Sequence, residues 1–268
     1  MDMNVPIITL LTDFGLEDTY VASMKGVILG ISPPSRLVDI SHLVPPQDVR
    51  AGAFLLASVF RSFPAGTIHL VVVDPGVGTD RLGLVIKTNE YFFVGPDNGL
   101  FSWVLREERG WEAYSLEHPG YRLSSVSSTF HGRDIFAPAA AHLAKGVPAE
   151  AMGPRCTPHS GSWAEPIIGD EEVLGEIIHI DHFGNAVTNV SREMIEPFAP
   201  LPCLRVRVGD LTIPRIVTTY GDQGKGETVA LIGSTNHLEI AVNQGNAAKS
   251  LSLCRGVPVS IERQDRRG

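Results

Sequence analysis

The sequence predicts a mixed α/β protein, with a Rossmann-like α/β domain over residues 1–160 and a mostly antiparallel β domain over residues 161–268. Three observations predict this. Apolar runs typical of strands alternate with helical patterns over the first 74 residues, which favours a parallel sheet covered by helices. Residues 154–166 are rich in Pro, Gly and Ser and have little periodicity, which indicates a linker. Short alternating segments follow and predict the second domain.

Local sequence features predict each helix and strand. The expected helices carry apolar residues three or four apart, such as Val21, Met24 and Ile28, and Asp48 lies in a first turn where the helix dipole favours a carboxylate. In the first domain we expect strands over 7–12, 36–40 and 67–73, a hairpin over 82–88 and 91–95, and helices over 19–31, 47–63, 96–105 and 133–146. In the second domain we expect strands over 172–180, 204–209, 228–233, 238–242 and 258–262.

Composition narrows the class of partner. The chain is 43% hydrophobic and 19% charged, with a formal net charge of −8 and a sequence pI near 5.6. This balance argues against general nucleic-acid binding, which needs clustered Lys and Arg, so we expect a small-molecule partner. The C-terminal ERQDRRG is a short basic cluster of mixed sign, which we expect to be a solvated tail.

Several sequence features that would indicate a membrane, a metal or a cofactor are missing. We expect no membrane partner, because there is no run of about 18 apolar residues and no signal peptide. Cys156, Cys203 and Cys254 are widely spaced, which predicts reduced thiols in the cytoplasm. His179 and His182 have no HExxH-like partner, and the dinucleotide and triphosphate glycine motifs are missing, so we expect neither a metal nor a cofactor.

Two carboxylates follow strands of the predicted parallel sheet. Asp13 follows the first strand and Asp74 the third, and ligands bind α/β sheets at such carboxyl ends. Asp13 is either a turn residue before Gly15 or a carboxylate that accepts hydrogen bonds from vicinal hydroxyls of a sugar. Asp74 is either a strand-to-turn junction or the partner of Arg81, whose guanidinium could reach back across the loop and hold a water or an anion.

Other candidates are more ambiguous. His131 lies at the entry to an expected helix, where it either caps the helix or, kept neutral by the helix N-terminus, positions a water. In the second domain, the segment 180–189 contains Asp181, Phe183 and Asn185. It either forms an ordinary turn or binds a nucleoside, with the Asn185 amide hydrogen-bonding to an adenine edge and the Phe183 ring offering a stacking face. Ser234 either binds a carboxylate or closes a hairpin.

With these stretches assembled, the chain resembles the family of adenosine-forming S-adenosylmethionine hydrolases, also called hydroxide adenosyltransferases, which are relatives of the fluorinases and chlorinases. The resemblance runs nearly end to end. It is carried by LTDFG, DTYVASMKG, VDISH, DVRAGAFLL, VVVDPGVGT, PDNGLFSWV, STFHGRDIFAP, IDHFGNAVTN and LEIAVNQGNAA. It implies an α/β domain joined to a β-barrel-like domain, and trimers whose sites lie between the first domain of one subunit and the second domain of its neighbour.

The resemblance also implies residue roles. Asp74, Arg81 and His131 would hold and activate the attacking water, and Asp13 would grip the ribose hydroxyls. The second domain would supply Asn185 for adenine and Asp181 for the methionine portion. Further nucleoside contacts are implied at Ser234, Glu239 and the backbone of Val242.

Departures from the halogenases favour water as the nucleophile. The halogenases have Tyr where this chain has Asp74, and the fluorinase has a halide-binding Ser in place of Gly132 and an aromatic residue in place of Gln47. A carboxylate would repel a halide by several kcal/mol at short range. The sequence therefore predicts hydrolysis of S-adenosylmethionine to adenosine and methionine, with a halogenase and a non-catalytic adenosine or S-adenosylmethionine sensor as alternatives.

Overall fold

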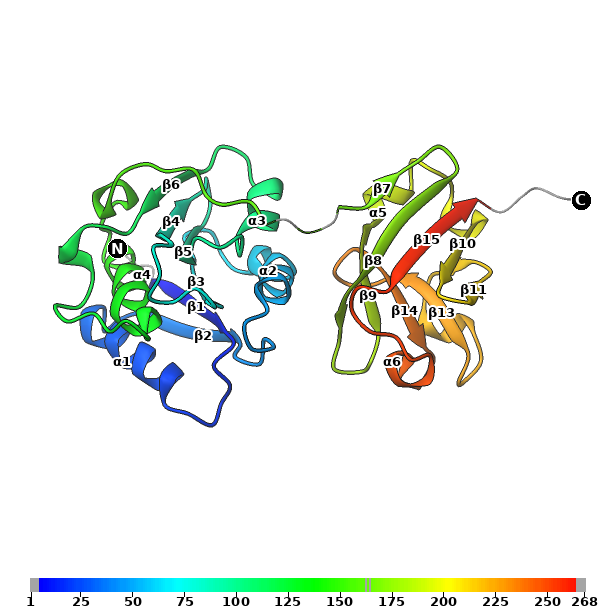
Figure 1. Ribbon diagram of the computed structural model, residues 1–268, viewed down its shortest axis with the longest axis horizontal. Coiled ribbons are helices and arrows are strands. Elements are labelled where there is room, and N and C mark those ends of the chain that lie inside the picture. Colours follow the sequence, from blue (N-terminus) through cyan, green and yellow to red (C-terminus); the bar gives the residue numbers. More distant parts are fainter. Residues whose placement is uncertain (1–4, 162, 164, 264–268) are drawn as a thin grey trace, which may run out of the picture. The chain divides into compact units, whose positions relative to one another are not determined.

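A computed structural model describes residues 5–161, 163 and 165–263, and Figure 1 shows its course. The last five residues of the expected tail, 264–268, lie outside the described residues. The chain divides into two compact units, Met1–Ser162 and Trp163–Gly268. No helix within the described ranges is long and apolar enough to cross a membrane.

The first unit is built on a six-stranded sheet with the order β2-β1-β3-β5-β4-β6. The first four strands in this order run parallel, whereas β4 and β6 run antiparallel to their neighbours. The strands are β1 (Ile7–Thr12), β2 (Arg36–Ser41), β3 (Ile68–Val72), β4 (Gly83–Lys87), β5 (Phe92–Pro96) and β6 (Glu112–Ser115). The expected parallel strands and the β4–β5 hairpin are confirmed, and β6 is an element that the sequence did not predict.

Helices cover both faces of this sheet (Figure 1). The α-helices are α1 (Tyr20–Ile31), α2 (Val49–Ala57), α3 (Ser102–Glu107) and α4 (Ala137–Ala144), with shorter turns η1 (Phe60–Ser62), η2 (Pro119–Tyr121), η3 (Gly132–Phe136) and η4 (Ala149–Met152). Ile8 and Leu10 of β1 are fully buried in one core cluster with Met24 of α1 and Ala140 of α4. Leu11 alternates to the opposite face and is also fully buried.

Several boundaries differ from the sequence prediction. The helix expected over 96–105 begins only at Ser102 and ends at Glu107. The helix expected over 47–63 ends at Ala57 and continues only as the 3-10 turn η1. The helix expected over 133–146 begins as a π-helix, η3, directly after His131. The boundary between the two units, after residue 162, falls within the linker expected over 154–166. Residues 154–161 hydrogen-bond to the first unit, because the backbone of Cys156 donates to the carbonyl of Ala113 and that of Gly161 donates to the Ser102 hydroxyl. This stretch therefore packs on the first unit.

The second unit is a nine-stranded sheet with the order β11-β10-β15-β8-β9-β14-β13-β12, and β7 pairs with β8 beside this path. Apart from the parallel β12–β13 pair, the pairings between strands are antiparallel. The strands are β7 (Ile167–Ile168), β8 (Glu172–Ile180), β9 (Ala186–Ser191), β10 (Leu204–Val208), β11 (Leu211–Ile213), β12 (Ile216–Val217), β13 (Thr228–Ile232), β14 (His237–Val242) and β15 (Pro258–Arg263). Short helices are α5 (Arg192–Ile195), α6 (Ala247–Ser250), η5 (Leu201–Cys203) and η6 (Tyr220–Asp222).

This second sheet curls into a nearly closed, barrel-like shape. The strands at its two ends approach each other, since β10 contacts β12 and β11 contacts β13. Its interior is apolar, with Ile177, Val206 and Ile240 all fully buried in one cluster. The five expected strands are confirmed. The sequence missed β9, because Thr188 and Asn189 are polar residues that suggest a turn, although both lie buried in the strand.

Candidate active site

The carboxyl ends of two neighbouring parallel strands bring Asp13 and Asp74 to one edge of the first sheet. β1 and β3 are paired in register, with Thr12 opposite Val72, so the residues just after each strand emerge side by side. Burial is the largest cause of the raised pKa of Asp13, and the charge of Asp74 is near enough to add to it. The order of the strands therefore accounts for this pairing of acids.

Arg81 forms a two-pronged ion pair with Asp74 across the loop that follows β3. Its Nε donates to Oδ1 of Asp74 at 2.8 Å, and its Nη2 donates to Oδ2. The side chains are only 10% and 5% exposed, so solvent screens this pair weakly. The Arg81 guanidinium also lies 5.3 Å from the centre of the Phe136 ring. Bidentate pairing fixes the planes of both groups as well as their separation.

His131 joins this pair through the same guanidinium. The Nη2 of Arg81 lies 2.8 Å from Nδ1 of His131. Because arginine can only donate, Nδ1 must accept, which requires a neutral imidazole with its proton on Nε2. The pKa of His131 is lowered, first by burial and then by the charge of Arg81. The sequence had attributed a neutral imidazole to the helix N-terminus, whereas burial and Arg81 are the leading causes in the folded chain.

Asp13 lies in a turn that is held by hydrogen bonds to the loop after β2. Its Oδ2 accepts the backbone N–H of Gln47 at 2.8 Å. On either side of Asp13, the Thr12 hydroxyl is 2.8 Å from Nδ1 of His42, and the Gly15 N–H donates to the carbonyl of His42. Burial is the main reason that the pKa of Asp13 is raised. A partly buried carboxylate is suited to accept hydrogen bonds from a ligand.

In the second unit, Asp181 and Asn185 close the turn between β8 and β9. The Asn185 backbone N–H and its Nδ2 donate to the two carboxylate oxygens of Asp181 at 2.8 and 2.9 Å. Phe183, between them, is 72% exposed, with its ring 5.6 Å from that of His182. Asn185 itself is buried. The turn thus presents an aromatic face beside a fixed carboxylate and amide.

The other predicted residues of this unit lie along β14. Ser234 is in the turn before the strand, where the Gly233 N–H donates to the carbonyl of His237, so a hairpin turn accounts for its backbone. Val242 is at the opposite end, and its carbonyl accepts the Gly245 N–H. Ser234 and Val242 are therefore not brought together.

Glu239 lies between these ends and is 6% exposed. The Tyr220 hydroxyl donates to its Oε1 at 2.6 Å. Burial raises the pKa of Glu239, the Tyr220 hydrogen bond lowers it, and the charge of Asp181 raises it. Asp181 and Glu239 thus form a second group of interacting carboxylates.

Sequence reasoning missed Tyr220 as a partner of Glu239 in the second unit, and His42 as a partner of the turn at Asp13 in the first. Tyr220 starts η6, whose capping box between Thr219 and Asp222 could have been read from the TTYGD segment. No local signal places its hydroxyl against a glutamate 19 positions away. The contact between His42 and Thr12 likewise depends on the pairing of β1 with β2.

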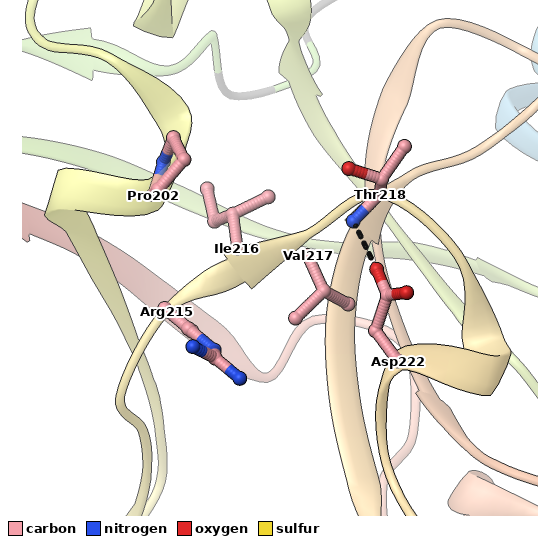
Figure 2. A pocket seen from close by; sticks show the side chains of 6 residues that line it. All are labelled: Pro202, Arg215, Ile216, Val217, Thr218 and Asp222. Atoms are coloured by element: carbon pink, nitrogen blue, oxygen red, sulfur yellow. Dashed lines mark hydrogen bonds between the residues drawn. The ribbon is translucent and has the colours of Figure 1, made fainter.

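An open depression of about 350 Å³ lies elsewhere on the second unit (Figure 2). Its lining residues are Pro202, Arg215, Ile216, Val217, Thr218 and Asp222. Inside it, the Thr218 N–H donates to the carboxylate of Asp222 at 2.9 Å. None of the predicted site residues lines this depression. Across the described part of the chain, no group of three or more His, Cys, Asp and Glu side chains is placed to hold a metal.

The matched domains define the class of protein. Residues 8–153 match the SAM hydroxide adenosyltransferase N-terminal domain, and residues 175–260 match the corresponding C-terminal domain. The chain belongs to this family, which confirms the resemblance drawn from the sequence blocks.

Individual relatives agree with this assignment. The chain is 42% identical to the (R)-S-adenosyl-L-methionine hydrolase of Thermus thermophilus, over 94% of this chain and 97% of the relative. It is 29% identical to a fluorinase of Nocardia brasiliensis, over 96% and 97% of the two chains. The crystal structure of an uncharacterized conserved protein from Thermotoga maritima has a TM-score of 0.89 and 39% identity, covering 96% of this chain and all of that one.

The Tyr220–Glu239 contact predicts a pH-dependent loss of stability in Tyr220→Phe. Because the folded-state pKa of Glu239 is raised, its contribution to stability is present below the ordinary carboxyl pKa and is lost as pH rises through the raised value. Removing the hydroxyl raises that pKa further and enlarges the loss. We expect the variant to be destabilised more at pH 8 than at pH 5, by about 1 kcal/mol, a modest figure because Tyr220 is 41% exposed. Chemical denaturation at both pH values measures it.

Tyr114→Phe is the matched control, because it removes a tyrosine hydroxyl that donates to Glu112 in the first unit. We expect its effect on stability to be the same at both pH values within experimental error. An equal loss for Tyr220→Phe at pH 5 and pH 8 would show that Glu239 does not titrate against this hydroxyl.

Proposed function

We propose that the chain hydrolyses S-adenosyl-L-methionine to adenosine and L-methionine. Water attacks the ribose C5′ carbon, a C5′–O bond forms, and the C5′–S bond breaks with its electron pair leaving on methionine sulfur. The water loses one proton to the protein or solvent. The observation that carries this proposal is the Asp74–Arg81–His131 cluster at the carboxyl ends of parallel strands, in a chain of the hydroxide adenosyltransferase family.

The proposed water lies between Asp74 and His131. Asp74 is ion-paired yet retains lone pairs that can accept the water proton, whereas the neutral imidazole presents an N–H at Nε2 that can donate to the water oxygen. Arg81 fixes both groups and needs no proton transfer of its own. The geometry favours Asp74 as the acceptor, and His131 as the group that orients the nucleophile.

Alignment supplies most of the catalytic effect in this proposal. The sulfonium is already a good leaving group, so the departing side needs no acid. Holding the water in line with the C5′–S bond can remove roughly 7–11 kcal/mol of barrier. As the attacking water gains hydroxide character, its negative charge and the positive charge of the sulfonium cancel in the transition state. A pocket of low polarity favours such a transition state over the separated ions.

Substrate recognition is proposed to divide between the domains. The first domain, residues 1–160 and Rossmann-like in its use of strand ends, would bind ribose through Asp13 and hold the water. The second, residues 161–268, would contact adenine through Asn185 and Phe183 and the methionine portion through Asp181, with nucleoside contacts from Ser234, Glu239 and the Val242 backbone. The raised pKa of Asp13 and the fixed geometry of Asn185 support these roles. S-adenosylmethionine is thus a substrate, and no cofactor is proposed.

A halogenase and a non-catalytic sensor are the competing functions. A halide in the water position would meet the Asp74 carboxylate at short range, at a cost of several kcal/mol. A sensor would need the nucleoside contacts and would not need an Asp–Arg–His cluster with a defined tautomer. The cluster therefore favours hydrolysis over both.

We also propose a homotrimer with sites at subunit interfaces, as the family resemblance implies. Exposed apolar side chains near the candidate residues support it: Leu16 and Leu43 in the first unit are 69% and 68% exposed, and Phe183 in the second is 72% exposed. Sedimentation equilibrium should give three times the chain mass of 28.9 kDa. A monomer at micromolar concentration would contradict the proposal.

The function itself predicts turnover without additives. Purified protein incubated with S-adenosyl-L-methionine should release adenosine and methionine in equal amounts, in step with loss of substrate. The reaction in ¹⁸O-labelled water should place the label on the 5′ oxygen of adenosine, because water is the nucleophile. Chloride- or fluoride-dependent loss of substrate without labelled adenosine would instead identify a halogenase, and tight binding without turnover would identify a sensor.

Asp74→Asn and Asp13→Asn should fail in different ways. The first removes the proton acceptor and should lower kcat by roughly 10²–10⁴-fold while leaving adenosine affinity unchanged. The second removes the charged acceptor for the ribose hydroxyls and should weaken adenosine binding by roughly 10- to 100-fold. Steady-state kinetics and calorimetric titration with adenosine separate the two effects.

Asp80→Asn and Asp18→Asn are matched controls, since both carboxylates are exposed and lie in the same two loops. We expect wild-type kinetics and affinity from both. Wild-type turnover in Asp74→Asn would exclude Asp74 from the water site, and unchanged adenosine affinity in Asp13→Asn would exclude the ribose role.

A further inference from the structure

Gly78 is where the loop carrying Asp74 and Arg81 touches the segment that leads to His131. A Cβ atom on Gly78 would lie 2.4 Å from the carbonyl oxygen of Ser128, closer than such atoms approach in proteins. Gly78 also has a φ of +79°, in the left-handed region that favours glycine. The two backbones therefore meet directly, with no side chain between them.

Asp134 holds the other side of the Ser128 segment. Its side chain is fully buried, and its Oδ2 accepts the Ser127 N–H at 2.7 Å. Its Oδ1 accepts from Nε of Arg133 at 2.6 Å, and its backbone carbonyl accepts the Leu123 N–H. Asp134 belongs to η3, the π-helix that begins directly after His131. The segment against Gly78 is thus fixed to the same turn that carries the imidazole.

The contact between Arg81 and His131 depends on this docking. Asp74 and Arg81 come from the loop after β3, whereas His131 comes from a segment 50 positions later in the chain. A 2.8 Å hydrogen bond between them survives a shift of only a few tenths of an ångström. The Gly78–Ser128 approach joins the two segments within a few residues of both partners, so it controls their separation more directly than the sheet does.

We propose that Gly78 is a positioning residue, whose missing side chain lets the Asp74–Arg81 loop dock on Ser128 and thereby sets the Arg81–His131 contact. This rests on the proposed function for its kinetic consequence only. The contact itself lies within the first unit, so its role in positioning can be tested without substrate.

Gly78→Ala and Gly76→Ala form a matched pair in one loop. A Cβ on Gly76 would make ordinary contact, 3.4 Å from Cγ of Arg81, and Gly76 does not have a positive φ. We expect Gly78→Ala to lower kcat by at least roughly 10²-fold, as a misplacement of about 1 Å does, with KM for S-adenosylmethionine within about threefold of wild type. Gly76→Ala should keep both constants near wild type.

The ring of His131 reports the docking directly. The charged groups that act on it are Arg81, Asp74 and Asp134, and burial and Arg81 are the two largest causes of its lowered pKa. When the loop undocks, Arg81 moves away and water enters, so the pKa of His131 should rise in Gly78→Ala and stay unchanged in Gly76→Ala. NMR titration of the imidazole signals measures this, with His131→Gln used to assign the resonance.

The outcomes separate the positioning role from a general loss of stability. A Gly78→Ala variant that is folded, with unchanged kcat and an unchanged pKa of His131, overturns the proposal, as does a loss of kcat with no change in that pKa. If Gly78→Ala does not fold, Ser127→Pro carries the test, because it removes the N–H that Asp134 accepts and should also raise the pKa of His131. Absence of turnover in the wild type would refute the proposed function, while the NMR result would still decide the docking.

Discussion

The guanidinium of Arg81 is the feature on which the candidate active site depends. It binds both oxygens of Asp74 and donates to Nδ1 of His131, so one planar group fixes a carboxylate and an imidazole from distant segments. Burying such charges is costly unless their hydrogen bonds are satisfied, and here one group satisfies several at once. The same bonds determine chemistry: Asp74 stays an acceptor, and His131 is limited to the tautomer with a proton on Nε2.

The scaffold makes this arrangement possible through strand order. β1 and β3 are adjacent and parallel, so Asp13 and Asp74 leave the sheet at the same edge. Apolar residues on both faces of β1 bury it between helices, which makes the position of Asp13 a consequence of core packing. The loops then complete the site: Gln47 donates to Asp13, and Arg81 returns across the Gly-rich turn to Asp74. Rigid strands place the acids, and loops supply their partners.

Sequence patterns predicted the parts of the fold that local rules determine. Buried apolar runs and helical spacings gave β1, β3 and α1, and the turn at Asn89 and Glu90 gave the β4–β5 hairpin. They failed where long-range pairing overrides local character. Buried polar residues in β9 resemble a turn. The contacts Arg81–His131 and Tyr220–Glu239 join segments that no periodicity relates. For the site, the sequence located the Asp74–Arg81 ion pair, whereas the role of each residue came from the family resemblance.

The distribution of carboxylates within each unit bears on the charge of the substrate proposed above. Burial is the main cause of the raised pKa of Asp13 and of Glu239, and a second carboxylate adds to each, Asp74 in the first unit and Asp181 in the second. Arg81 balances the charge of Asp74, so Asp181 and Glu239 are the pair that gains most from a nearby cation. The proposed substrate, S-adenosylmethionine, would bring a sulfonium and an ammonium to balance these charges, together with one carboxylate of its own. A halide nucleophile would add a further negative charge, whereas water carries no charge until it is activated. In the proposed reaction, the electrostatics that favour a cationic substrate would therefore also favour a neutral nucleophile.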